Sequence, residues 1–523
     1  MKKLRIALSA AALAALFLTI VWLWWLDRSG PVHVDLTLEG DIPATLYLPD
    51  RSSSETGHLA EPPPPELRPA AVVLAHGFSE DRLAMSGLAR AMSRAGYAVL
   101  TLDFRGHGAN RNPFSPERGR ADFLYSDLAA AVDFLRSSPD VDGSRIVVMG
   151  HSMGAGASLT YGTRDTGIDG VVLISGGWRM TGPHRPPNAL FIYGEGDPLD
   201  LRRHSQRLAA RLAGRSRAEP GIVYGEFDEA RAVSHVQVSG ADHITILYST
   251  SAVRQIIAWL DHIYGVERGT FFVPPDRRLW PALLGLLALV LVLPGLGEVV
   301  GRLAPRLAER PGRGVAANLL WLVVALLATL PLVAVGSPGS LISLEVADIA
   351  VTHLLLAGGV LLVGFALVGR LRPSELVSDW PATVSAAAVG CAAVYFLLTP
   401  ISGVMLRLSL TPERAALAVF ATLLLLPFAL AFHFLLRRGG VALSTLVSSL
   451  GRLAVLAVFV GSVKLGIAPF VVLLMVPVLV LLFFLFEVLG ASIYATSRNW
   501  KVAAFLEALW LAWIFAAVLP VRV

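Results

Sequence analysis

The second half of this chain consists mainly of long runs of leucine, valine and alanine that begin at Leu279. These runs constrain the fold strongly, because a segment of about 20 apolar residues can cross a bilayer only if its backbone hydrogen bonds are satisfied internally, as in a helix. Charged residues make up 16% of the 523 residues, below the usual share in soluble proteins. We therefore predict an all-α, multi-span membrane domain over 279–523.

Eight predicted spans divide this domain, each close to the length that a bilayer requires. They lie near 279–297, 315–335, 347–369, 382–400, 415–436, 441–463, 468–489 and 501–520. A further span opens the chain, where basic residues precede a mostly apolar run that ends in Trp22, Trp24 and Trp25. This run is longer than the core of a cleavable signal peptide, so we predict an uncleaved signal anchor over 1–27.

The distribution of basic residues predicts the orientation of these spans. Loops at 302–313, 370–372, 437–438 and 498–501 are rich in Arg or Lys and fall on the same side as the N-terminus. An excess of basic residues is typical of cytoplasmic loops, so these four loops are predicted to be cytoplasmic. The loop with Arg407 and Arg414 is the one exception, because it is basic but falls on the opposite side. We expect an integral membrane protein whose soluble segment lies outside the cytoplasm.

Two further observations concern the membrane domain and the chain's single cysteine. Arg452 falls near the middle of a predicted span, where burying an ionisable side chain in lipid costs free energy. Such a residue has either a functional role or a role in helix packing. Cys391 is the only cysteine, so the soluble segment must be stable without an internal disulfide.

Residues 28–270 have the charges and turn residues of a soluble domain. A predicted hairpin over 32–48 precedes alternating strands and helices. The other strands are expected at 70–75, 98–102, 171–174, 190–193 and 236–238, and the helices at 83–95, 122–136, 199–213 and 250–263. This alternation predicts a mostly parallel sheet with helices on both faces.

One more predicted strand, Ile146-Val-Val-Met149, runs into Gly150-His-Ser-Met-Gly154, a G-x-S-x-G sequence. This pattern is typical of a nucleophile elbow, in which a tight strand-to-helix turn raises a serine hydroxyl above the sheet. Glycine is needed on both sides of the turn because a Cβ would clash there.

Five motifs occur in order at the ends of predicted strands: His76-Gly-Phe78, Asp103-x-Arg-Gly-His-Gly108, Gly150-x-Ser-x-Gly154, Gly194-Glu-Gly-Asp197 and Gly240-Ala-Asp-His243. Over 32–264 the chain resembles the α/β-hydrolase superfamily, and most closely the serine-hydrolase branch that includes dienelactone-hydrolase-like enzymes, esterases and S9/S33-type peptidases. The resemblance implies an α/β-hydrolase fold for this segment and does not extend to the membrane domain.

Ser152 is a poor nucleophile unless a base takes its proton. His243 is the predicted base, because it follows a strand and comes after the serine, as the superfamily order Ser…Asp…His requires. His76 and His107 precede the serine, and we assign His151, inside the elbow, a structural role. The remaining histidines of the soluble segment that compete for this role, His184, His204, His235 and His262, are interpreted as surface residues.

Asp197 is the predicted acid that orients the imidazole, with Glu195 and Asp200 as alternatives and a helix N-cap as its competing structural role. The resemblance implies an oxyanion hole formed by the backbone N–H groups of Phe78 and Met153.

The loop 176–188 is too short for a helical lid. Within it, Trp178 and Arg185 are candidate substrate contacts. The turn Asp103–Gly108 is interpreted as structural, with Arg105 and His107 shaping the site.

These features predict a membrane-anchored, extracytoplasmic serine hydrolase that cleaves carboxylic esters, lipid-derived ones included, through an acyl-enzyme. The alternatives are a serine peptidase or acyltransferase with the same triad, and a transporter or sensor whose α/β domain only binds a ligand. No metal cluster, phosphate loop or dinucleotide motif occurs, so no cofactor and no metal are expected. The expected partners are a small-molecule or lipid ester and the lipid bilayer, without nucleic acid. The sequence specifies no oligomeric state.

Overall fold

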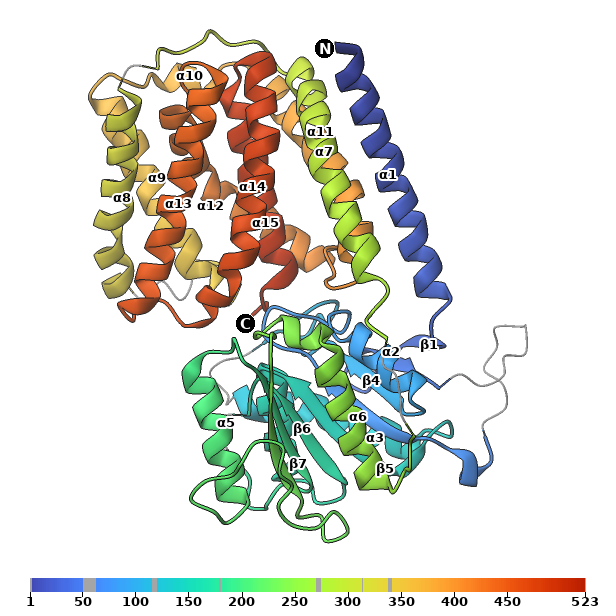
Figure 1. Ribbon diagram of the computed structural model, residues 1–523. Coiled ribbons are helices and arrows are strands. Elements are labelled where there is room, and N and C mark those ends of the chain that lie inside the picture. The colour runs from blue at the N-terminus through green and yellow to red at the C-terminus, as the bar shows by residue number, and fades with distance from the viewer. Residues whose placement is uncertain are drawn as a thin grey trace. The chain divides into compact units, whose positions relative to one another are not determined.

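The computed structural model describes residues 2–49, 63–114, 120–177, 180–269, 274–312, 314–336 and 341–522. The chain forms two compact units. The first is built mainly from Leu23–Trp280 and contains the sheet, whereas the second contains the residues up to Trp22, Pro281–Ser402 and Leu408–Val521 and is helical (Figure 1).

The first unit is organised around one eight-stranded sheet with the order β1-β2-β4-β3-β5-β6-β7-β8. Its strands are β1 (His33–Leu38), β2 (Ile42–Tyr47), β3 (Ala70–Ala75), β4 (Ala98–Leu102), β5 (Asp142–His151), β6 (Gly170–Ile174), β7 (Ala189–Gly194) and β8 (Val233–Val238). β1 and β2 form the predicted antiparallel hairpin, β2 also pairs antiparallel with β4, and the strands from β4 to β8 are parallel. The prediction of a mostly parallel sheet is confirmed.

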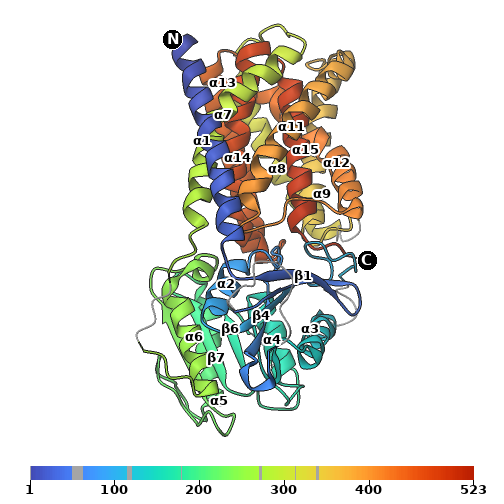
Figure 2. The same ribbon diagram turned by 90° about the vertical axis from the view of Figure 1, so that its right-hand side faces the viewer.

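Helices cover both faces of this sheet (Figure 2). They are α2 (Ser86–Arg94), α3 (Arg120–Ser137), α4 (Met153–Gly162), α5 (Leu199–Leu212) and α6 (Thr250–Tyr264). Strand residues alternate between the two faces. On β3, Val73 belongs to the core that α3, α4 and α5 cover, and its neighbour Val72 belongs to the core under α2 and α6. The fully apolar strands of the sequence reflect this burial on both sides.

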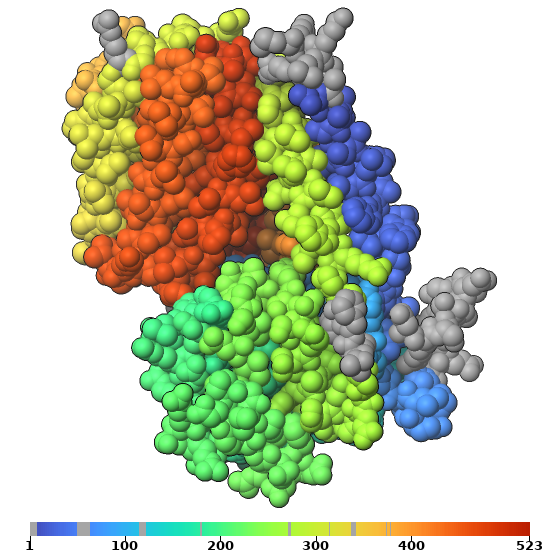
Figure 3. Space-filling model, viewed as in Figure 1, coloured from blue at the N-terminus to red at the C-terminus, as the bar shows by residue number. Residues whose placement is uncertain are grey.

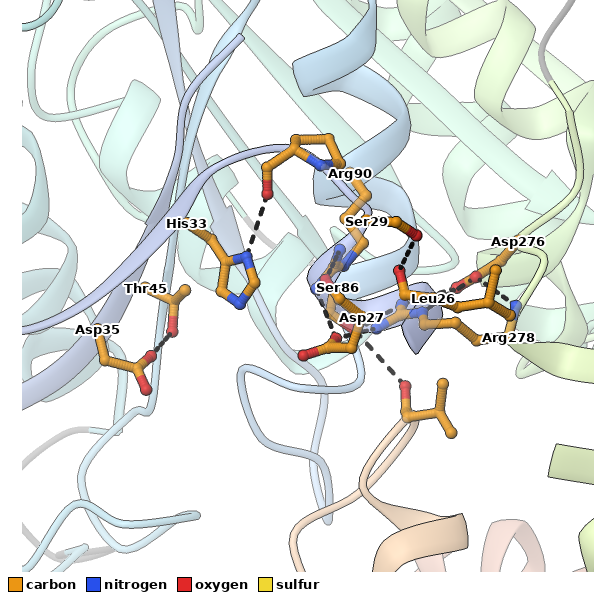
Figure 4. Close-up of polar contacts among 12 residues, drawn as sticks. Leu26, Asp27, Ser29, His33, Asp35, Thr45, Ser86, Arg90, Asp276 and Arg278 are labelled. Atoms are coloured by element: carbon orange, nitrogen blue, oxygen red, sulfur yellow. Dashed lines mark hydrogen bonds and ion pairs between the residues drawn. The ribbon is translucent and has the colours of Figure 1, made fainter. Parts of the chain in front are cut away.

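A polar network fixes the ends of the first unit's chain (Figure 4). Asp27, in the last turn of helix α1 (Lys2–Arg28), accepts a 2.6 Å hydrogen bond from Arg90 of α2. Arg278 lies 3.6 Å from the same carboxylate and is held by Asp276 at 2.7 Å. Arg278 also donates to Ser86 at 2.9 Å. Asp27 and Arg278, near the two ends of this unit's main segment, therefore both contact α2, Asp27 through an ion pair with Arg90 and Arg278 through a hydrogen bond to Ser86.

Within the described residues, nine helices are long and apolar enough to cross a membrane. Besides α1 they are α7 (Leu279–Leu303), α8 (Val315–Gly336), α9 (Ala347–Leu367), α11 (Trp380–Ser402), α12 (Pro412–Leu436), α13 (Val441–Lys464), α14 (Val471–Ser497) and α15 (Trp500–Val518). α7 lies at the surface in Figure 3, and its exposed residues include Leu283, Leu287 and Leu291. The short α10 (Pro373–Val377) connects α9 to α11.

Helices α12 to α15 enclose a cluster of charged side chains. Arg452 of α13 donates to Glu487 of α14 and, at 2.5 Å, to Glu507 of α15. Arg437, directly after α12, forms two hydrogen bonds of 2.7 and 2.8 Å to Glu487. His433 Nε2 lies 2.8 Å from Glu507. The ionisable residues within the predicted spans thus include a group that pairs across four helices.

Candidate active site

The serine of the G-x-S-x-G sequence lies on a strained turn between β5 and α4. Ser152 has φ 51° and ψ −108°, a conformation that residues with a Cβ rarely adopt. A Cβ on Gly150 would lie 2.4 Å from the carbonyl carbon of Gly154, and a Cβ on Gly154 would lie 2.5 Å from the Ala75 carbonyl oxygen. The two glycines therefore allow α4 to start directly against the end of β3.

The three predicted triad residues form one chain of hydrogen bonds. Ser152 Oγ lies 3.1 Å from His243 Nε2, and His243 Nδ1 lies 2.6 Å from Asp197 Oδ1. They follow three parallel strands of the sheet, in the turn after β5, the loop after β7 and the loop after β8, and β6 lies between β5 and β7. In this order His243 can accept the serine proton on Nε2 while Asp197 holds the Nδ1 proton.

Asp197 is fixed by donors other than the imidazole. Its Oδ2 atom accepts hydrogen bonds from Ser175 Oγ at 2.6 Å and from Gly194 N–H at 2.7 Å. Burial alone would raise the pKa of this carboxyl, but the hydrogen bonds from His243 and Ser175 outweigh burial and hold the pKa of Asp197 below its ordinary value. Asp197 is therefore ionised at neutral pH, as an imidazole-orienting acid must be.

The alternative acids lie elsewhere. Glu195 is exposed and accepts from Gly240 N–H at 3.1 Å, and Asp200 is exposed in the first turn of α5. Asp242 accepts hydrogen bonds from Ile244 N–H and Thr245 N–H, so it shapes the loop that carries His243.

The loop after β3 supplies one of the predicted oxyanion donors. His76 Nε2 accepts from Phe104 N–H at 3.0 Å, so the Nδ1 proton is the one that bonds the Gly77 carbonyl at 2.7 Å. Burial lowers the pKa of His76, in agreement with this neutral form. The C=O and N–H of one trans peptide point in opposite directions, so this bond turns the Phe78 N–H away from His76.

The second predicted donor is the backbone N–H of Met153, the first residue of α4. N–H groups in the first turn of a helix have no intrahelical acceptor and carry the positive end of the helix dipole. This N–H directly follows the serine and is suited to stabilise negative charge beside it.

The turn Asp103–Gly108 is held by polar contacts with residues outside it. Asp103 accepts from the Arg82 side chain at 2.5 Å and from Ala109 N–H at 2.9 Å, and Arg105 pairs with Asp127 at 2.5 Å. The ring of His107 lies 5.0 Å from that of His76 and 6.0 Å from that of Phe78. This turn packs against the loop that carries Phe78.

Of the two candidate substrate contacts, the structure describes only Arg185, and it places this residue away from the serine. Trp178 lies outside the described residues. The Arg185 guanidinium donates to the carbonyl oxygens of Leu212 and Arg231. Arg231 precedes β8, so Arg185 lies at the edge where the parallel strands begin, opposite to the edge that carries Ser152.

Sequence reasoning did not single out Ser175 or Glu80. Ser175 directly follows β6. Its position at the carboxyl end of a parallel strand, where the other site residues also lie, is the sequence feature that could have identified it. Glu80 lies three residues after the His-Gly pair and accepts a 2.6 Å hydrogen bond from Gly77 N–H. Among the described residues, no group of three or more His, Cys, Asp or Glu side chains is arranged to hold a metal ion.

Comparisons with known proteins find similarity to hydrolases over part of this chain. Residues 68–195 match the family model described as serine aminopeptidase, S33. The chain is 33% identical over 105 residues to a monoacylglycerol lipase of Mycolicibacterium smegmatis, covering 20% of this chain and 36% of that protein. It is 25% identical over 224 residues to a bis(hydroxyethyl) terephthalate hydrolase of Streptomyces coelicolor, covering 41% of this chain and 60% of that protein.

The chain thus spans less than two thirds of the length of each of these relatives. Among solved structures, a dienelactone hydrolase from Anabaena variabilis matches 46% of this chain and all of that chain, with 18% identity and a TM-score of 0.32. The family match covers the strands and turns from β3 to β7, including the Ser152 elbow. The N-terminal half of this chain therefore carries an α/β-hydrolase domain.

Proposed function

We propose that this protein is a membrane-anchored serine hydrolase that cleaves carboxylic esters through an acyl-enzyme on Ser152. The observation that carries the proposal is the hydrogen-bond chain from Ser152 Oγ through His243 to Asp197. A domain that only binds a ligand has no need of a strained serine in contact with a buried His–Asp pair. The relatives named as a lipase and a terephthalate ester hydrolase support an ester substrate.

The proposed reaction has two halves. Ser152 Oγ attacks the ester carbonyl carbon while its proton moves to His243 Nε2, and the N–H groups of Phe78 and Met153 stabilise the oxyanion. The carbon–oxygen bond to the alcohol then breaks, and the alcohol leaves with the proton from His243. Water, deprotonated by His243, attacks the acyl-enzyme and releases the acid, which restores the Ser152 hydroxyl.

A panel of chromogenic substrates tests this activity on the purified full-length protein. We expect hydrolysis of p-nitrophenyl esters by the wild type and loss of at least about 10³-fold in kcat for Ser152→Ala and His243→Gln, because each removes a triad member. Asp197→Asn should lose about 10⁴-fold in kcat through the wrong imidazole tautomer. Ester hydrolysis that survives in Ser152→Ala would contradict the proposal.

The S33 family description favours a serine peptidase as the second candidate. Aminoacyl p-nitroanilides in the same panel distinguish the two, since a peptidase would cleave them at rates comparable with those of the esters. An added alcohol or amine that captures the acyl group in place of water would instead identify an acyltransferase.

A further inference from the structure

Behind the triad lies a second pair of ionisable residues that the reaction above does not use. His151 is the residue before the nucleophile and is 1% exposed, and the side chain of Glu80 is 13% exposed. His151 Nδ1 lies 3.0 Å from Glu80 Oε1 and 3.1 Å from Oε2. His151 Nε2 lies 2.8 Å from the backbone carbonyl oxygen of His243.

These partners determine the charge of His151. A carboxylate and a carbonyl are both acceptors, so both ring nitrogens must donate, and only the imidazolium has two N–H groups. His76, directly after the neighbouring strand β3, bonds one acceptor, the Gly77 carbonyl, and one donor, the Phe104 N–H, so it is neutral by the same reasoning. Of these two buried histidines, His76 is therefore neutral and His151 is cationic.

The acid–base equilibria agree with a charged pair. Burial would lower the pKa of His151, but the charge of Glu80 and its hydrogen bond, with the His243 carbonyl, raise the pKa of His151 above its ordinary value. Burial would raise the pKa of Glu80, but His151 and the Gly77 N–H hold the pKa of Glu80 below its ordinary value. Both shifts favour the ionised form of the pair.

The pair connects three parts of the site. Glu80 Oε2 accepts the Gly77 N–H at 2.6 Å, and Gly77 belongs to the loop whose next amide is the predicted oxyanion donor of Phe78. His151 is the last residue of β5, and its Nε2 donates to the backbone carbonyl of His243. A Cβ on Gly77 would lie 2.9 Å from both Glu80 Oε2 and His151 Nδ1, so the loop is packed directly against the ion pair.

We propose that Glu80 and His151 are positioning residues, a charged brace that fixes the catalytic imidazole and the oxyanion-hole loop relative to Ser152. The inference rests on the proposed serine hydrolase function. The His151 ring centroid lies 5.0 Å from that of His243. Loss of the brace should therefore slow the proton transfer through His243, although no group that touches substrate is removed. Misplacement of reacting groups by about 1 Å costs on the order of 10²-fold in rate.

The direction of the pH effect follows from the His151 charge. The charged and titratable groups around the pair are Asp197 and His243 beside His151, and His76 and Tyr248 beside Glu80. Because the folded-state pKa of His151 is raised, the brace is complete below the ordinary histidine pKa and is lost as pH rises through the folded-state value. Glu80 determines the lower limit of the pH range in which the ion pair is intact. Its pKa is lowered in the folded protein, so its contribution to stability is lost only as pH falls through that lowered value.

The test compares Glu80→Gln, Glu80→Asp and His151→Gln in the full-length protein with p-nitrophenyl butyrate as substrate. Glu80→Gln keeps an acceptor for the Gly77 N–H but removes the charge, so His151 loses its proton at lower pH. We expect kcat to fall by about 10- to 100-fold with KM changed less than about threefold. The alkaline limb of the kcat/KM profile should move to lower pH by at least about one unit, and Glu80→Asp should restore much of both.

His235→Gln is the matched control for His151→Gln. The interpretation of His235 as a surface residue is wrong, because this histidine of β8 is 2% exposed. Its ring nitrogens lie 2.9 Å from Tyr193 Oη and 2.9 Å from the Ala218 carbonyl oxygen, and neither of these partners belongs to the triad. His235→Gln should lower the melting temperature without moving the pH profile. Wild-type kcat and an unmoved alkaline limb in Glu80→Gln would overturn the proposal.

A second readout separates this inference from the proposed function. If the wild type hydrolyses no ester, the pH dependence of the melting temperature still tests the brace. The wild type should lose stability as pH rises through the His151 pKa, and Glu80→Gln should lose that alkaline step. Parallel melting curves for both proteins from neutral to alkaline pH would overturn the inference, whatever the catalytic result. Should Glu80→Gln fail to fold, Glu80→Asp gives the same comparison with a smaller expected shift.

Discussion

At the scale of residues, the candidate site depends on side chains that hold other side chains in place. Ser175 is the clearest case, because its hydroxyl donates to the Asp197 oxygen that does not contact His243. Serine motifs, strand ends and chain order predict Ser152, His243 and Asp197 as a triad, and the structure brings the first and last of these side chains within hydrogen-bond distance of the imidazole. These sequence features could not reveal Ser175, because a serine after a strand is common and its contact depends on the course of the next loop.

We predict that Ser175→Ala lowers both kcat and stability moderately. Loss of one buried hydrogen bond to a carboxylate costs about 1.5–3 kcal/mol, and the imidazole still holds Asp197. Because the pKa of Asp197 is lowered in the folded protein, the stabilisation is present above its ordinary pKa and is lost as pH falls. The difference in melting temperature between variant and wild type should therefore shrink toward acid pH.

Ser93→Ala is the control for this experiment. Ser93 is buried and donates to the Leu48 carbonyl at 2.7 Å, with no carboxylate involved. Its effect on the melting temperature should be independent of pH and should leave kcat unchanged. A Ser175→Ala variant that behaved in the same way would show that Ser175 has no part in charging Asp197.

At the scale of elements, the sequence predicted which strands and helices form but placed some ends incorrectly. β8 begins at Val233, three residues before the predicted start. Val233 and Ser234 belong to the strand because they pair with β7, which the local sequence pattern does not indicate. α14 continues to Ser497, eight residues past its predicted end, and buries Ile493 and Tyr494 in its last turns. Hydropathy detects the apolar part of a helix, whereas packing against neighbours determines where the helix ends.

The close approach of α4 to β3 gives a prediction at this scale. In Gly154→Ala the new Cβ would lie 2.5 Å from the Ala75 carbonyl and 2.6 Å from the His76 carbonyl, both backbone atoms. We expect a loss of about 1–3 kcal/mol in unfolding free energy and a large loss of ester hydrolysis, since the elbow must shift. Thermal melting and kcat measure both effects.

Gly269→Ala provides the comparison, because a Cβ there meets no atom within 4 Å and the residue has no positive φ. It should leave the melting temperature and kcat close to those of the wild type. Equal behaviour of the two alanine variants would contradict the packing that we describe for the elbow.

At the scale of the whole molecule, an α/β-hydrolase domain and a set of apolar helices are encoded in one chain. The sequence showed this division through hydropathy and marked Arg452 as an unusual charge within a span. It could not identify Glu487 and Glu507 as the partners of Arg452. That pairing depends on how each helix is rotated about its axis, which hydropathy does not specify.

Removal of Arg452 should destabilise the helical unit. Arg452→Met leaves two buried glutamates without their shared cation, and breaking a buried ion pair costs about 3–5 kcal/mol. The matched variant Arg302→Met removes a guanidinium whose side chain is 64% exposed and pairs with Glu298 one turn away, and it should cost less than about 1 kcal/mol. Thermal unfolding in detergent compares the two, and equal effects would contradict a structural role for the buried cluster.

The proposed side of the membrane can be tested by cysteine labelling in a Cys391→Ser background. Glu219 of the hydrolase domain and Arg306 in the loop after α7 are both exposed, so a cysteine at either position can react. A membrane-impermeant maleimide should label Glu219→Cys in intact cells and Arg306→Cys only after lysis. The reverse pattern would place the hydrolase domain in the cytoplasm.

Labelling with a fluorophosphonate, followed by mass analysis of the modified peptide, tests the reactivity of Ser152 most directly. Such a reagent bonds covalently only to a serine whose proton a neighbouring base can take. We predict one adduct on the peptide that carries Ser152, with labelling abolished in Ser152→Ala and strongly slowed in His243→Gln. An unlabelled wild type that is folded by thermal melting, or an adduct on a different serine, would contradict a hydrolase that acts through Ser152.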